Sequence, residues 1–88
     1  MTATAVAGQV HAFIRSRVGG RDIGADTDIF EEGLVDSLFA MELITFVETT
    51  FGLSVLTEDL DRDNFCSVHA ITRFVLGKNG AAARRDPG

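Results

Sequence analysis

Residues 36–52 read DSLFAMELITFVETTFG and contain the most complete helix pattern in the chain. Asp36 or Ser37 suits the N-cap position, and Gly52 suits the position that ends a helix. Between these ends, apolar residues recur at steps of three and four: Ala40, Leu43, Ile44, Val47 and Phe51. This spacing predicts an amphipathic helix from about Ser37 to Phe51.

A second apolar set lies near the start of the same helix and consists of Leu38, Phe39 and Met41. These residues cannot all share the stripe that faces the core, because each residue turns the helix by about 100°. We therefore expect part of this set to face solvent or a partner.

On the N-terminal side, residues 3–18 carry one apolar stripe: Val6, Val10, Phe13, Ile14 and Val18. The stripe predicts a helix that ends at Gly19 and Gly20. Residues 19–35 show no sustained period, so we expect a long loop held to the core by a few apolar residues. These are Ile23, Ile29, Phe30 and Leu34. Thr27 is expected to cap a single helical turn over residues 27–30.

On the C-terminal side, residues 57–60 predict a short helix, with acidic residues in its first turn. Ser67 is expected to cap a last helix with apolar positions at Val68, Ile71, Phe74 and Val75. Gly77 is expected to end that helix. We predict a domain over residues 1–77 and a disordered tail over residues 78–88.

The charge is unevenly distributed along the 88 residues, whose formal net charge is −5. Eleven carboxylates and no Lys or Arg occur between Asp22 and Asp61. Such a region repels nucleic acid and anionic membranes and attracts partners with basic surfaces. The sequence contains no membrane-spanning stretch and no export signal near its start, so we expect a cytoplasmic monomer.

Sites for catalysis or metal binding are not expected. Cys66 is the single cysteine, which excludes an internal disulfide and indicates a reducing compartment. Residues 59–64 resemble the start of a calcium loop, but Asn64 and Ala70 stand where that loop needs Gly and a bidentate Glu. Neither histidine has a ligand partner at helical spacing.

The motif Asp36-Ser37-Leu38 is preceded by FEEGL at residues 30–34 and followed by Glu42-Leu43 and Phe51-Gly52. This pattern resembles the acyl carrier proteins of fatty acid, polyketide and nonribosomal peptide assembly. The resemblance implies an all-α, acyl-carrier-type antiparallel bundle of three long helices and one short helix, with a long loop between the first two. It also implies that a transferase attaches 4′-phosphopantetheine from coenzyme A to Ser37.

The resemblance further implies roles in recognition and packing. Asp36 would contact the transferase, and Leu38, Met41 and Glu42 would dock partner enzymes. Those partners would be a cargo-loading enzyme, tailoring enzymes, and an acyltransferase or synthase that receives the cargo. Five residues match family positions around the bundle interior, where some members shelter an acyl chain: Leu43, Val47, Phe51, Phe74 and Val75. Their spacing by itself predicts core packing.

The cargo is less sharply defined. Carriers of fatty acid synthesis usually have an acid two residues after the modified serine, whereas this chain has Phe39. The stretch FEEGLVDSLFAM at residues 30–41, with LDRDNF downstream at residues 60–65, resembles free-standing carriers of polyketide extender units, such as glycerate-derived hydroxymalonyl or methoxymalonyl groups, and this is our first expectation. Two alternatives stay open: a discrete carrier of D-alanyl, another aminoacyl or a peptidyl group, and an unmodified acidic interaction module. None of these functions includes catalysis by the chain itself.

Overall fold

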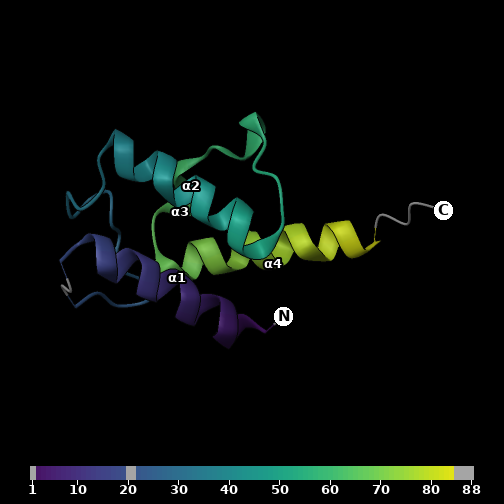
Figure 1. The fold of residues 1–88 in the computed structure, drawn as a ribbon, viewed down its shortest axis with the longest axis horizontal. Coiled ribbons are helices and arrows are strands. Elements are labelled where there is room, and N and C mark those ends of the chain that lie inside the picture. Colours follow the sequence, from purple (N-terminus) through teal and green to yellow (C-terminus); the bar gives the residue numbers. More distant parts are fainter. Residues whose placement is uncertain (1, 20–21, 85–88) are drawn as a thin grey trace.

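The computed structural model describes residues 2–19 and 22–84, and these form four α-helices, one 3-10 turn and no strand. The helices are α1 (Ala3–Arg17), α2 (Ser37–Phe51), α3 (Arg62–Phe65) and α4 (Val68–Arg84), and the 3-10 turn is η1 (Thr57–Asp59). Figure 1 shows that α2 and α4 both run in the direction opposite to α1. The predicted all-α, acyl-carrier-type helical bundle is confirmed.

Helix α1 begins where the Thr2 hydroxyl accepts a hydrogen bond from the Ala5 N–H (3.1 Å). Its predicted stripe faces inward, since Val6, Val10 and Ile14 are fully buried. The helix ends next to Gly19, whose φ of 74° lies in the left-handed region that favours glycine. The bounds therefore agree with the expected helix within one residue at its C-terminal end.

The long loop between α1 and α2 is tied to the other helices by apolar and backbone contacts. Ile23 and Ile29 are buried in the core. The Ile29 N–H donates to the Cys66 carbonyl (2.8 Å), and the His69 N–H donates to the Ala25 carbonyl (2.9 Å). His11 Nε2 donates to the Ile23 carbonyl (3.0 Å), which adds a tie to α1. Residues 23–29 of this loop are therefore held against α1, the end of α3 and the start of α4.

A helical turn forms in this loop, since the Glu32 N–H donates to the Asp28 carbonyl (3.0 Å), but Asp28 caps it and not Thr27 as expected. The Asp28 carboxylate accepts the N–H groups of both Phe30 and Glu31 (3.0 Å each), and the chain forms hydrogen-bonded turns there. Thr27 instead accepts the Gly24 N–H through its hydroxyl (2.9 Å). An Asp side chain satisfies two consecutive N–H groups well, which favours Asp28 as the organising residue.

The segment after α2 also differs from its prediction. One short helix was expected over residues 57–60, and the structure has the three-residue turn η1 followed by the four-residue helix α3. The Asp61 carboxylate caps α3 by accepting the Asp63 N–H (2.9 Å). Phe65 at the end of α3 is buried and tilts against Phe74 of α4, with ring centroids 5.1 Å apart.

Helix α4 begins where predicted and ends later. The Ser67 hydroxyl accepts the Ala70 N–H (3.0 Å), as expected of a cap. The predicted end at Gly77 is wrong, because the helix continues to Arg84. Gly77 does not adopt the positive φ of a helix-ending glycine. The expected disordered tail is helical over residues 78–84, and its remainder, 85–88, lies outside the described residues.

Packing places α4 against both α1 and α3, while α2 contacts α1. The core uses the inward stripes of α1, α2 and α4 together with Ile23, Ile29 and Phe65. Within the described ranges, no helix combines the length and the apolar character that crossing a membrane requires.

Candidate functional site around Ser37

Ser37 is the first residue of α2 and is exposed. The adjacent Asp36 caps the helix, because its carboxylate accepts the Phe39 N–H (2.8 Å). Among the described residues, the Ser37 hydroxyl has no hydrogen-bond partner. The structure thus leaves this hydroxyl free for chemistry and gives the capping role to its neighbour.

The start of α2 suits a covalently held phosphodiester. The N–H groups of Ser37 and Leu38 donate to no acceptor within the described part of the chain. Free N–H groups and the positive end of the helix dipole together stabilise a nearby anion. An arm attached through phosphate at Ser37 therefore fits the residues present. When attached, such an arm supplies a thiol that holds cargo as a thioester.

The two apolar residues nearest Ser37 on α2 point outward. Leu38 and Met41 are each 68% exposed, whereas Phe39 is buried with its ring centroid 6.0 Å from that of Phe13. The expectation that part of the apolar set faces outward is confirmed. Phe39 lies on the inward face of α2, so packing accounts for an aromatic residue where an acid was expected.

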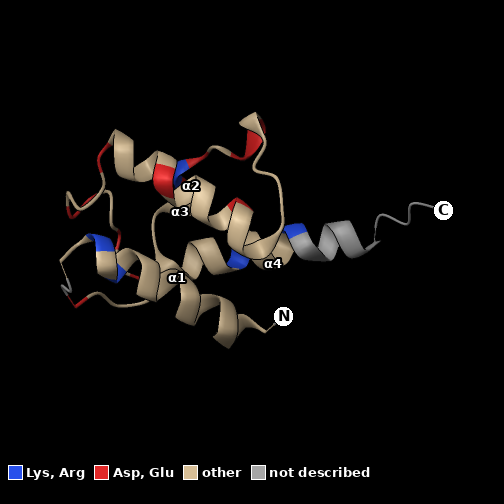
Figure 2. Cartoon of the chain, in the orientation of Figure 1, with Lys and Arg blue, Asp and Glu red and all other residues tan. Residues whose placement is uncertain are grey.

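Both carboxylates of α2 are already engaged. Glu42 pairs with Arg17 of α1 (Nη1 to Oε2, 2.8 Å), and Glu48 accepts the Val55 N–H (2.8 Å). Figure 2 shows that most acidic residues lie instead in the loops on either side of α2. The exposed face of α2 is therefore largely apolar and neutral, with the acidic charge around it.

A pocket of about 290 Å³ lies between α2 and the η1–α3 segment. Its walls are mostly apolar and include Ala40, Ile44, Leu60 and Phe65. The small side chain of Ala40 lines this pocket. The five residues predicted to surround the interior divide as follows: Leu43, Val47, Phe51 and Val75 are buried, and Phe74 is half-buried.

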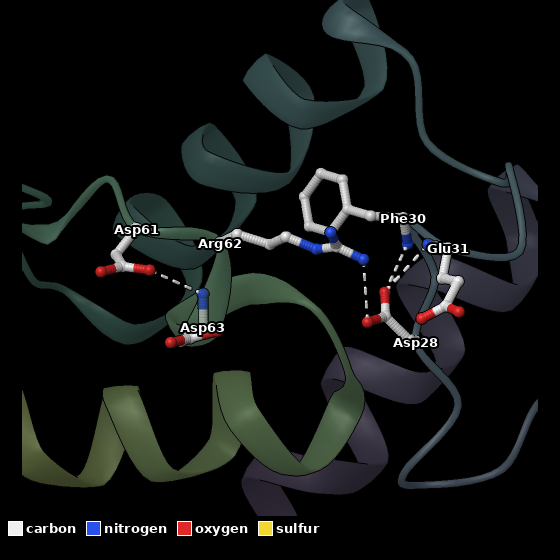
Figure 3. A network of polar contacts seen from close by, with 6 residues as sticks. All are labelled: Asp28, Phe30, Glu31, Asp61, Arg62 and Asp63. Carbon is white, nitrogen blue, oxygen red and sulfur yellow. Dashed lines mark hydrogen bonds and ion pairs between the residues drawn. The ribbon is translucent and has the colours of Figure 1, made fainter.

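Arg62 holds one edge of this pocket in place. Its guanidinium donates to Asp28 (3.0 Å) and lies 5.8 Å from the centroid of the Phe30 ring. Figure 3 shows Arg62 reaching from the start of α3 to the loop that leads to Ser37. Sequence reasoning missed this residue, because nothing in a linear pattern indicates a pairing across 34 positions.

Cys66 and His69, the other polar residues examined in the sequence, make no hydrogen bond or ion pair with Ser37. Cys66 is half-buried at the end of α3, and His69 Nδ1 lies 3.4 Å from an Asp26 carboxylate oxygen. In the described ranges, no three His, Cys, Asp or Glu side chains come together in a way that could hold a metal ion.

Two ion pairs should make the stability of the fold depend on pH. The Glu31 N–H and the Arg62 guanidinium hold the pKa of Asp28 below its usual value. Lys78 (2.6 Å) and the Leu56 N–H do the same for the pKa of Asp59. A depressed carboxyl pKa stabilises the fold above the unfolded-state pKa of about 4, and that stabilisation is lost as pH falls through the folded-state value.

We therefore expect thermal stability to fall steadily below about pH 4. Asp59→Asn should lower stability at pH 7 and flatten this acid limb, because the variant has no carboxylate to protonate there. Circular dichroism melts between neutral and acid pH would measure both effects. Asp22→Asn, which removes an exposed carboxylate, provides the control. An acid limb equally steep in the wild type and Asp59→Asn would contradict this assignment.

Comparison with known proteins agrees with this fold and defines the class of the chain as a carrier protein. The family model described as "Phosphopantetheine attachment site" matches residues 14–75, a range that includes the α2 start and the pocket. The chain therefore belongs to the phosphopantetheine-attachment family, whose members carry covalent 4′-phosphopantetheine and perform no catalysis of their own.

Several curated relatives are named D-alanyl carrier proteins. That of Bacillus velezensis is 45% identical over 40 residues, covering 46% of this chain and 51% of the relative. That of Streptococcus pyogenes serotype M5 is 36% identical over 52 residues, covering 59% and 62%. That of Lactococcus lactis subsp. cremoris MG1363 is 36% identical over 53 residues, covering 60% and 67%. The chain thus spans between about half and two thirds of these relatives' lengths.

Proposed function

We propose that Ser37 is the attachment point of the phosphopantetheine arm. The observation that carries this proposal is the exposed Ser37 hydroxyl, which has no partner among the described residues and lies next to free helix N–H groups. Asp36 and the exposed Leu38 and Met41 flank it and would contact partner enzymes. Glu42 would join that contact after releasing Arg17.

Incubation of the apo protein with coenzyme A, magnesium and a broad-specificity transferase tests the proposal. Intact-mass spectrometry should show the gain of one phosphopantetheinyl group on the wild type. A folded protein that stays at its apo mass would contradict the proposal and leave the unmodified interaction module as the account. Circular dichroism establishes that the sample is folded.

For the cargo, we propose an aminoacyl group of the D-alanyl type, held as a thioester on the arm. The similarity to D-alanyl carrier proteins favours this alternative over the first expectation of a polyketide extender unit. A small cargo also needs little shelter, which agrees with the modest size of the pocket beside α2. The partners would be an enzyme that activates the amino acid with ATP and an acceptor of the aminoacyl group. We place this carrier in the cytoplasm, where coenzyme A is supplied.

A loading competition tests the cargo. The holo protein would be offered D-alanine with ATP and a D-alanine-activating ligase, and separately malonyl-type coenzyme A thioesters with an acyltransferase. We expect a D-alanyl adduct that hydroxylamine removes, as it would from a thioester, and no adduct on the apo protein. Loading only from the malonyl-type donor would contradict the proposed cargo and restore the extender-unit interpretation.

A further inference from the structure

A second hollow, of about 380 Å³, lies on the other side of the exposed face of α2, between α2 and α1. We call it the α1–α2 hollow and define it by Phe13, Arg17, Met41, Glu42 and Phe46, which line it. Each residue turns the helix by about 100°. Met41 therefore lies about 40° around α2 from Ser37, on the side of this hollow, and Ala40 lies about 60° from Ser37 on the side of the α3-side pocket. The exposed face of α2 thus separates the α3-side pocket from the α1–α2 hollow.

The floor of the α1–α2 hollow is aromatic. The rings of Phe13 and Phe46 stack with their centroids 4.2 Å apart, and both side chains are only half-buried. The exposed Met41 extends this apolar surface toward Ser37. Partly exposed aromatic and Met side chains with a polar rim are typical of protein interfaces.

Arg17 lies across this floor. Its guanidinium is 5.2 Å from the centroid of the Phe13 ring, and its Nη1 is 2.8 Å from Glu42 Oε2. Both side chains are partly exposed, at 46% and 35%, so the pair contributes little to stability and another cation can replace it at small cost. Arg17 therefore occupies the position that a partner's cation would take on Glu42.

The charge of the chain indicates the kind of partner. No Lys or Arg occurs between Asp22 and Asp61, so the surface around α2 attracts a basic protein face. Arg17 reaches α2 from α1 and neutralises one of its two carboxylates. A partner that binds here must therefore exchange its own cation for Arg17 on Glu42.

We propose that the phosphopantetheinyl transferase docks in the α1–α2 hollow. An apolar side chain of the transferase packs against Phe13, Phe46 and Met41, and its Arg or Lys displaces Arg17 from Glu42. This inference rests on the proposed function, because it concerns the partner that modifies Ser37. In this arrangement Arg17 competes with the transferase's cation for Glu42 and so weakens docking. Glu42 is the residue that pairs with the incoming cation.

Transfer kinetics on four variants test the exchange. Arg17→Gln should raise kcat/KM for modification about two- to five-fold through KM, the effect expected from removing an exposed competing ion pair. Glu42→Gln should lower kcat/KM by a similar factor. In the double variant the effect of Arg17 should disappear. Arg73→Gln, which removes the same charge from an exposed position on α4, is the matched control.

Two results would overturn the inference while the proposed function stands. One is a folded Arg17→Gln protein that is modified no faster than Arg73→Gln. The other is a rate gain from Arg17→Gln that persists in the Glu42→Gln background. A wild type that gains no arm at all would instead refute the proposed function, and with it the transferase as the docked partner.

Discussion

Ser37→Ala should abolish attachment of the arm and leave the fold unchanged. The hydroxyl oxygen is the atom that would form the phosphodiester, and alanine has no replacement for it. The cap of α2 comes from Asp36, so the substitution removes no capping hydrogen bond. Alanine is also the better helix former, and we expect a stability change within about 0.5 kcal/mol. Intact mass and a melting curve on the same sample separate the two effects.

Ser54→Ala is the matched control for this experiment. Ser54 is exposed in the connection after α2, far along the chain from the helix start, and the change is chemically identical. This variant should gain one arm at the wild-type rate. Attachment to Ser37→Ala, or loss of attachment in Ser54→Ala, would show that the arm lies elsewhere.

The second large effect is expected at Leu43, on the face of α2 opposite to the exposed residues. Leu43 is fully buried among the inward stripes of the helices. Truncation to alanine removes apolar contact and leaves a cavity, which costs about 3 kcal/mol in comparable cores. A domain of this size has a total stability of roughly 5–15 kcal/mol. The melting temperature should therefore fall by more than about 10 °C.

Leu38→Ala is the internal comparison, because it makes the same substitution on the same helix at an exposed position. Its stability should change by less than about 0.5 kcal/mol. Its rate of modification by the transferase should nevertheless fall, since Leu38 lies beside Ser37 in the proposed contact surface. Equal destabilisation by the two variants would contradict the inward and outward faces described for α2.

The sequence predicted α2 and the start of α4 well because their signals are local. An Asp cap, a left-handed Gly52 and apolar residues at helical spacing all occur within one segment. The end of α4 was missed because a glycine stops a helix only when it adopts positive φ, which the residue type alone does not determine. Gly77 stays helical, and the next residue, Lys78, is held by Asp59.

Some parts of the site could be predicted from the sequence and others could not, again because local signals are visible in a sequence and long-range contacts are not. Ser37 follows from a short motif, whereas the pairs Arg17–Glu42 and Arg62–Asp28 join residues far apart in the chain. Their opposite charges are visible in the sequence, but only the packing of α1 and α3 against their neighbours brings them together. Phe39, which was the argument against a fatty acid carrier, lies in the core of the structure.

Locating the arm on the modified wild-type protein decides whether Ser37 is the attachment point. Trypsin should release residues 22–62 as one peptide, since no Lys or Arg lies between Arg21 and Arg62. This peptide contains both Ser37 and Ser54, and its fragment ions distinguish them. We predict one phosphopantetheinyl group on Ser37. Its presence on Ser54, or its absence from this peptide, would show that Ser37 is not the attachment point.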